Sequence, residues 1–306
     1  MKYYNIKTQN KDINSAYIIG LILCLFLSAC KNRNYISYYN KVNEIDSIYR
    51  VTHQTDEAIK QYRKLFRKYK PQNQDRRDEY ENYIRLADQH NKNFGGKKSL
   101  YRLIPLIAPN WRYKKEDTSF IQLYKKYGIG KQEMEVKVEE WKKGLNQKLI
   151  DSFTVAFQRD QSSRKEGNYQ DVIKNDKKNA ELLKWMFENY GFPGLQKIGL
   201  WNDDLLMPSG PILLHMADYE EYHEYFKTKI LEYVKSGDCP PRDYAAMIDR
   251  NNSHHKLPYT YAVYQGYENI KDSATVNRNR KSIGLPSLKH AQWITKDFFK
   301  KIKKKN

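Results

Sequence analysis

The sequence predicts a mainly α-helical protein, with helical hairpins followed by a compact helical module that has at most a short β element. Apolar residues recur at three- and four-residue spacing through most of the chain, as they do along one face of an α-helix. Prolines and glycines punctuate these stretches at intervals of a helix length. One short segment, residues 261–266, is a candidate for a strand or an extended loop.

The first 30 residues have the organisation of a signal peptide. Lys2, Lys7 and Lys11 precede an apolar segment over residues 16–27. That segment is shorter than the roughly 20 residues that a membrane-spanning helix needs. A buried helix of a soluble core is the alternative interpretation. The small residues Ser28 and Ala29 directly before Cys30 favour a processed signal.

The sequence Leu27-Ser28-Ala29-Cys30 resembles a bacterial lipobox. The resemblance implies that residues 1–29 are a lipoprotein signal peptide and that Cys30 is acylated. Two or three acyl chains anchor a protein stably to a membrane. Lys31 follows Cys30, and the Gram-negative sorting rule then implies the outer membrane. We therefore expect an exported, lipid-anchored protein, and the sequence leaves open which leaflet it faces.

After a lipidated tether over residues 30–37, the next region, 38–130, is predicted to contain helical hairpins. Its first helix carries an apolar stripe from Tyr38 to Tyr49. A second helix opens at Thr55 and stops before Pro71. Two more are expected over residues 75–90 and 99–107. An irregular connector with one short helix, at residues 120–127, completes the region.

The following region, 131–295, is predicted to be a helical module, and residues 296–306 a basic tail. A long helix is expected over residues 132–162, with a kink near Gly144. Later helices are expected from about residue 176 to Gly191, from Pro211 to Gly237, and from Pro241 through Arg250.

Composition limits the partners and the chemistry. The full chain has a net charge of +19, which favours an anionic envelope surface or an acidic protein as partner. Nucleic acid is a less favoured partner than either of these, because the protein is expected to be exported. The chain lacks the His-Glu-x-x-His and Cys-x-x-Cys spacings, so we expect no metal site and no cofactor.

Six groups of polar and turn residues occur in a fixed order between about residues 147 and 290. They are Asp160, Gln161 and Arg164; Gly191, Phe192 and Pro193; His215, Ala217 and Asp218; Asp249 and Arg250; Tyr264 and Gln265; and Arg280, Gly284, Leu285 and Pro286. This ordered set resembles a bacterial family known only as a domain of unknown function. The chain departs from the family pattern at Leu214, where the family has glutamine, and at the inserted Met216. The resemblance implies no known activity.

Two of these groups supply the candidate catalytic residues. His215 and Asp218 are three residues apart and would share one face of a helix. A histidine oriented by a carboxylate is a typical general base. We therefore predict a site with His215, Asp218 and Asp249.

Four further polar residues are candidates for ligand binding. Arg164, Arg250 and Arg280 could hold a phosphate or carboxylate in forked contacts, and Gln265 could complete the pocket. The alternative is that the same polar set is a buried network that fixes helix packing.

Three functions remain open at this point. The first is binding or scaffolding at the cell envelope, with a protein partner. The second is a hydrolase-like enzyme that uses His215 and Asp218. The third is an immunity-like protein that neutralises an exported toxin.

Overall fold

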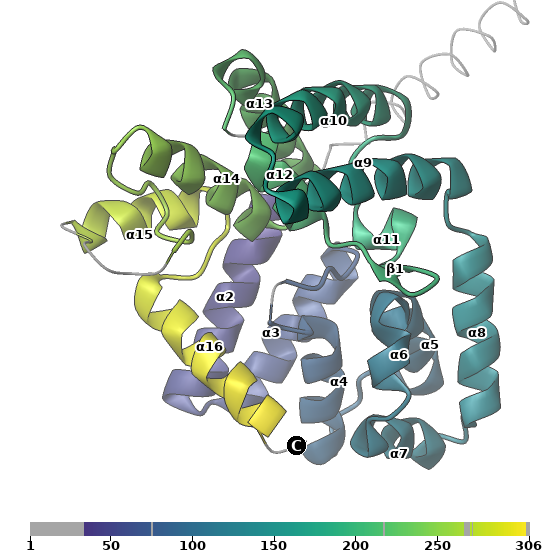
Figure 1. Ribbon diagram of the computed structural model, residues 1–306. Coiled ribbons are helices and arrows are strands. Elements are labelled where there is room, and N and C mark those ends of the chain that lie inside the picture. The colour runs from purple at the N-terminus through teal and green to yellow at the C-terminus, as the bar shows by residue number, and fades with distance from the viewer. Residues whose placement is uncertain (1–33, 75, 217, 266–269, 271, 304–306) are drawn as a thin grey trace, which may run out of the picture. The chain divides into compact units, whose positions relative to one another are not determined.

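Helices make up most of the computed structural model, which describes residues 34–303 except 75, 217, 266–269 and 271 (Figure 1). The described chain contains one small antiparallel pair of strands, β1 (Trp201–Asn202) and β2 (Leu205–Leu206), with Trp201 opposite Leu206. The predicted mainly α fold with a short β element is confirmed. The strand itself does not lie at residues 261–266, because the described residues 261–265 form a loop.

The first four described helices pack one on the next along the chain. They are α2 (Tyr35–Thr52), α3 (Thr55–Lys68), α4 (Glu79–Gln89) and α5 (Gly96–Ile107). The side chain of Asn34 caps α2 by accepting a hydrogen bond from the Ile36 N–H at 2.9 Å. Residues 35–37, predicted as tether, are therefore helical. Residues predicted to begin the third helix instead form a turn that a Gln74–Arg77 bridge closes.

The middle of the chain forms a series of shorter helices and then two long ones. They are η1 (Ala108–Asn110), α6 (Trp111–Lys114), α7 (Thr118–Lys126), α8 (Lys131–Lys143), α9 (Gln147–Glu166) and α10 (Tyr169–Tyr190). The single long helix predicted over residues 132–162 is wrong. The chain leaves helical conformation after Gly144, and Asn146 starts α9 by accepting the Leu149 N–H at 3.0 Å.

The last part of the chain packs partly against α9 and α10 and partly against α2. Its helices are α11 (Leu195–Ile198), α12 (Ser209–Met216), α13 (Glu220–Ser236), α14 (Pro241–His254), α15 (Ser273–Ser282) and α16 (Leu288–Lys303). The helix predicted from Pro211 to Gly237 is two helices, because the chain turns between Met216 and Glu220. α12 packs against α9, α10, α13 and α14.

Tyrosine supplies much of the core, which explains its abundance. Five tyrosines are among the largest side chains with almost no exposed surface: Tyr38, Tyr39, Tyr62, Tyr80 and Tyr124. Their hydroxyls need partners in this setting. Tyr124 donates to the Leu100 carbonyl at 2.8 Å. The ring fills the core, and the hydrogen bond to the backbone offsets the desolvation cost of burying the hydroxyl.

The two ends of the described chain lie side by side. α16 runs beside α2, where the His290 Nε2 lies 2.7 Å from the Asp46 Oδ2 (Figure 1). Asn43 in α2 also donates to the Gly284 carbonyl at 2.9 Å. Residues from 34 onward form one compact unit. The predicted basic tail begins inside α16.

The predicted signal peptide and Cys30 lie outside the described residues. Within the part of the chain that is described, no helix combines the length and the apolar composition needed to cross a membrane.

Candidate functional site

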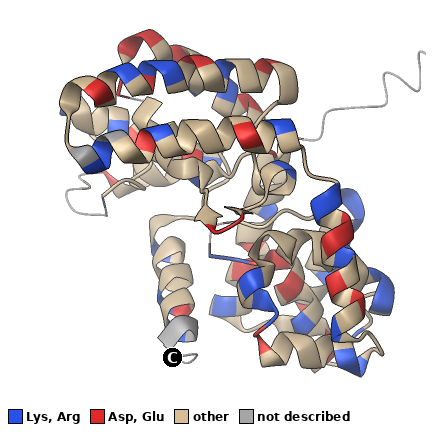
Figure 2. Cartoon of the chain, turned by 45° about the vertical axis from the view of Figure 1, so that its right-hand side comes forward, with Lys and Arg blue, Asp and Glu red and all other residues tan. Residues whose placement is uncertain are grey.

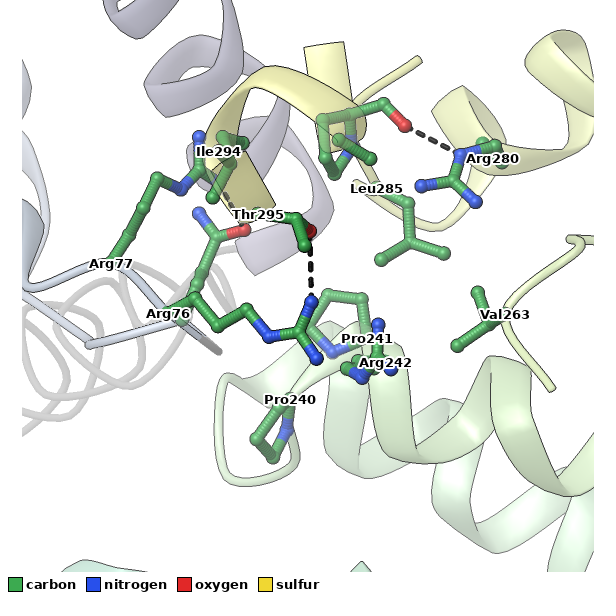
Figure 3. Close-up of a pocket in the computed structure, with 13 residues that line it drawn as sticks. Arg76, Arg77, Pro240, Pro241, Arg242, Val263, Arg280, Leu285, Ile294 and Thr295 are labelled. Atoms are coloured by element: carbon green, nitrogen blue, oxygen red, sulfur yellow. Dashed lines mark hydrogen bonds between the residues drawn. The ribbon is translucent and has the colours of Figure 1, made fainter. Parts of the chain in front are cut away.

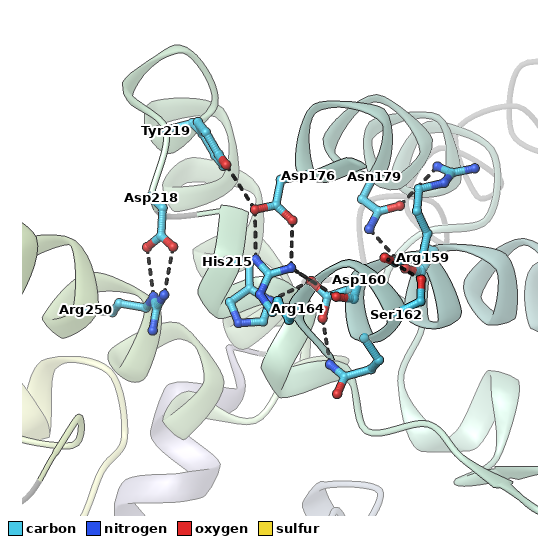
Figure 4. A network of polar contacts seen from close by, with 12 residues as sticks. Arg159, Asp160, Ser162, Arg164, Asp176, Asn179, His215, Asp218, Tyr219 and Arg250 are labelled. Atoms are coloured by element: carbon cyan, nitrogen blue, oxygen red, sulfur yellow. Dashed lines mark hydrogen bonds and ion pairs between the residues drawn. The ribbon is translucent and has the colours of Figure 1, made fainter. Parts of the chain in front are cut away.

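The predicted site residues fall into three neighbouring groups around α9, α12 and α14. The first group centres on Asp160, a fully buried carboxylate in α9. Its Oδ1 lies 2.6 Å from the Nδ1 of His215 in α12 and 2.8 Å from Nη1 of Arg164 (Figure 4). Asp160 and Arg164 are four residues apart, so they meet on one face of α9.

Arg164 joins this group to α10. Its Nη1 and Nη2 donate to the two oxygens of Asp176 at 3.0 and 2.8 Å, in a forked contact. The hydroxyl of Tyr219 donates to the same carboxylate at 3.0 Å. Burial raises the pKa of Tyr219 well above its usual value, and the negative charge of Asp176 adds to the effect. Tyr219 therefore stays protonated and remains a hydrogen-bond donor.

His215 has a defined tautomer when it is neutral. A carboxylate accepts hydrogen bonds only, so the nitrogen that faces Asp160 carries the proton. The other nitrogen, Nε2, is then a proton acceptor. The His215 side chain is 14% exposed, whereas that of Asp160 is 0% exposed. This combination of a buried orienting carboxylate and a partly accessible imidazole is suitable for general-base chemistry.

Asp218 belongs to a second group rather than to His215. It lies beyond the end of α12, so the shared helix face predicted for His215 and Asp218 does not form. Its two oxygens accept Nε and Nη2 of Arg250 at 2.8 and 2.7 Å. His254 lies against the same carboxylate, with its Nδ1 3.1 Å from Oδ1.

Arg250 and Gln265, both predicted ligand-binding residues, donate hydrogen bonds to the Tyr264 hydroxyl. Nη1 of Arg250 donates to the Tyr264 hydroxyl at 2.7 Å, and Gln265 Nε2 donates to the same oxygen at 3.2 Å. The guanidinium also lies over the Tyr264 ring, 5.6 Å from its centroid. Arg250 therefore holds the loop after α14 against the turn after α12.

Asp249 and Arg280 form the third group, which fixes the loop of residues 261–264 from two sides. The fully buried Asp249 accepts the Tyr261 and Val263 backbone N–H groups at 2.9 and 2.7 Å. Arg280 donates to the Tyr261 carbonyl at 2.7 Å. Burial raises the pKa of Asp249, although the backbone N–H groups oppose the rise. These contacts give both residues a backbone-binding role, and the predicted catalytic role of Asp249 and ligand-binding role of Arg280 stay predictions.

Several members of these groups were not predicted as site residues from the sequence, among them Asp160, Asp176 and Tyr219. The spacing of Asp160 and Arg164 was available as a signal for the first of them. The contacts of Asp176 and Tyr219 with Arg164 depend on tertiary packing.

The structure has two notable cavities, and His215 lines neither of them. One is a cavity lined by arginines from α14, α15 and the turn before α4. The other is an open depression over α9, α10 and α13. Among the described residues, no group of three His, Cys, Asp or Glu side chains is placed to hold a metal ion. No family model, curated protein or solved structure matches the chain.

Proposed function

We propose that this chain is a lipid-anchored protein of the cell envelope that binds an acidic protein partner through its helical body. We favour binding over catalysis because the arginines of the candidate site are engaged in contacts within the protein. Arg164 joins α9 to α10, Arg250 joins α14 to the turn after α12, and Arg280 fixes the 261–264 loop. Residues that are engaged in this way set the packing of the helices.

The open depression over α9, α10 and α13 is the surface that we assign to the partner. Arg159, Lys177 and Lys178 line it together with Glu181, Leu182 and Tyr222, so three basic residues outnumber one acidic residue there. Basic side chains around an aromatic ring are typical of protein interfaces. Basic and acidic residues alternate along many helices (Figure 2).

The net charge of +19 supports the choice of an acidic partner. Opposite charge on two proteins accelerates their encounter and disfavours partners of like charge. The lipobox-like sequence supports anchoring through Cys30. Replacing Cys30 with serine should prevent incorporation of labelled palmitate and release the protein from the membrane fraction. Unchanged labelling in this variant would exclude Cys30 as the anchor.

Photo-crosslinking in cells tests the proposed surface. A photoreactive residue placed at position 222 should form a cross-link to one acidic envelope protein. The double variant Lys177→Glu and Lys178→Glu should lose that cross-link. In the matched control, Lys137→Glu and Lys142→Glu on α8, the reversed charges lie at similarly exposed positions, and the cross-link should remain. Equal cross-linking in both double variants would contradict the assignment.

A second candidate function is hydrolysis with His215 as the general base, and the 2.6 Å contact between His215 and the buried Asp160 favours it. In this function Nε2 takes a proton from water or from a substrate hydroxyl. A panel of ester, amide and phosphoester substrates tests it with His215→Gln and Asp160→Asn. An activity that both variants lose, while their melting temperatures stay near that of the wild type, would favour the enzyme.

Stability measurements distinguish the two functions. If the polar set is structural, Asp160→Asn should lower the free energy of unfolding by about 3–5 kcal/mol, since it leaves Arg164 and His215 with one buried carboxylate fewer. The same variant should then retain the cross-link at position 222 under conditions where it is folded.

A further inference from the structure

Four arginines from separate parts of the chain line one small cavity (Figure 3). Arg76 and Arg77 come from the turn before α4, Arg242 from the first turn of α14, and Arg280 from the end of α15. The cavity has a volume of about 50 Å³. No Asp or Glu is among the described residues that line it. Like charges gathered around one space repel one another unless an anion lies between them.

Two of these guanidinium groups are buried. Arg77 is 4% exposed, and its Nη2 donates to the side-chain oxygens of Asn43 and Gln74 at 2.7 and 2.6 Å. Its Nη1 has no hydrogen-bond acceptor among the described residues, and the Oδ2 of Asp46 lies 3.6 Å away. A buried charged donor without an acceptor is energetically unfavourable. Arg280 is 3% exposed and donates to the carbonyls of Tyr261 and Pro286.

Arg76 reaches the cavity from a strained backbone. Its φ is +61°, in the left-handed region that bulky side chains rarely adopt. Nη1 of Arg76 donates to the Thr295 hydroxyl in α16 at 2.8 Å, which holds the side chain over the cavity (Figure 3). Strained residues of this kind concentrate at binding sites, where a side chain must be aimed.

The first turn of α14 adds a favourable field. Pro240 and Pro241 line the cavity, and α14 begins at Pro241 and extends for 14 residues. The N-terminus of a helix of this length carries partial positive charge. The cavity therefore combines four guanidinium groups and a helix N-terminus, and one buried guanidinium nitrogen, Nη1 of Arg77, has no hydrogen-bond acceptor among the described residues.

We propose that this cavity binds the phosphate group of a small phosphate-containing anion, either free phosphate or a lipid phosphomonoester headgroup. Guanidinium groups match the oxygens of phosphate in forked contacts and remain charged at all relevant pH values. A volume of about 50 Å³ admits a single small oxyanion and excludes a larger ligand from the interior. The binding site joins the turn before α4 to α14, α15 and α16.

Calorimetric titration of the full chain in neutral detergent tests the proposal, with inorganic phosphate added at constant ionic strength. We expect saturable binding of one phosphate per chain. Arg76→Ala and Arg242→Ala should each weaken binding about tenfold or more, since each removes a charged hydrogen-bond donor. Both residues are partly exposed, and circular dichroism verifies that the variants fold. The control Arg112→Ala removes an exposed arginine that pairs with Asp204, and it should leave binding unchanged.

A second titration distinguishes the two sources of phosphate. Dihexanoyl phosphatidic acid that competes with inorganic phosphate and loses affinity in Arg76→Ala would indicate a lipid headgroup. Binding of inorganic phosphate alone, with the same loss in the variant, would indicate the free ion. Absence of saturable binding to either probe would overturn the proposal. Equal affinity of the wild type and both cavity variants would also overturn it. If an alanine variant fails to fold, Arg242→Gln replaces it, with the same expected loss.

Discussion

The carboxylate of Asp46 should contribute a measurable, pH-dependent share of stability, because it joins α2 to α16. Its Oδ2 accepts a hydrogen bond from His290 at 2.7 Å and from Arg50 Nε at 2.8 Å. Burial alone would raise the pKa of Asp46. The hydrogen bond from His290 and the charges of Arg77 and Arg50 outweigh burial and lower the pKa from 3.8 to about 2.

The size and sign of the effect follow from this pKa. Each pH unit of difference between the folded and unfolded pKa is equivalent to about 1.4 kcal/mol. The difference between 3.8 and about 2 therefore corresponds to about 2.4 kcal/mol. A lowered pKa means that the folded protein favours the charged form. The stabilisation is fully present above pH 3.8 and is lost as the pH falls through 3.8 toward 2.

Urea unfolding of the wild type and Asp46→Asn, followed by tryptophan fluorescence, measures this contribution. At pH 7 we expect the variant to be about 2–3 kcal/mol less stable than the wild type. The difference should shrink as the pH approaches 2, because the wild-type carboxylate is then protonated. The control Asp56→Asn alters an exposed aspartate that pairs with Lys92, and it should change stability by less than about 1 kcal/mol. A difference between Asp46→Asn and the wild type that is absent at pH 7, or that does not change with pH, would refute the reasoning.

Three further variants or probes test the buried parts of the fold. Burial raises the pKa of Glu79 from 4.5 to about 7. The wild type should therefore lose about 3 kcal/mol of stability as the pH rises from 4.5 through 7. Glu79→Gln should remove this loss, which urea unfolding at a series of pH values would measure. Gly284→Ala should lower the free energy of unfolding by about 2–4 kcal/mol, because the glycine has φ +91° and an added Cβ would lie 2.6 Å from the Cβ of Tyr39. The thiol of Cys239 is fully buried and its pKa is raised by burial, so it should react with iodoacetamide only after unfolding, as peptide mass spectrometry would show.

Each of these predictions has a control variant or an outcome that would contradict it. For Glu79, stability of the variant that follows the same pH curve as the wild type would contradict the raised pKa. For Gly284, the comparison is Gly96→Ala, where φ is +55° but no atom lies within 4 Å of the added Cβ, so the loss should be smaller. For Cys239, rapid labelling under native conditions would contradict its burial.

The helical class of this protein is a local property and was accessible from the sequence. The spacing of Tyr38, Val42 and Ile45 predicts one buried face of a helix, and all three residues are buried in α2. Helix ends were less accessible. Asn146 and Asn168 begin α9 and α10 by capping N–H groups, and each of these short-range bonds competes with continuation of the helix.

The partners of the polar residues could not be predicted from spacing. His215 and Asp218 lie close in the sequence, yet the chain leaves α12 after Met216 and carries Asp218 to Arg250. His215 meets Asp160 instead, 55 residues earlier in the chain. A helix face predicts neighbours only while the helix continues.

The sequence by itself determined the helical fold class, the candidate lipidation residue Cys30 and the identity of most polar residues in the site. Only the tertiary structure decided that the two ends of the described chain pack together, through Asp46 and His290, and that four arginines from three distant segments line one cavity. The physical reason is the range of the interactions involved. Helix periodicity and capping act within a few residues, whereas ion pairs and cavities depend on which helix faces the core brings together.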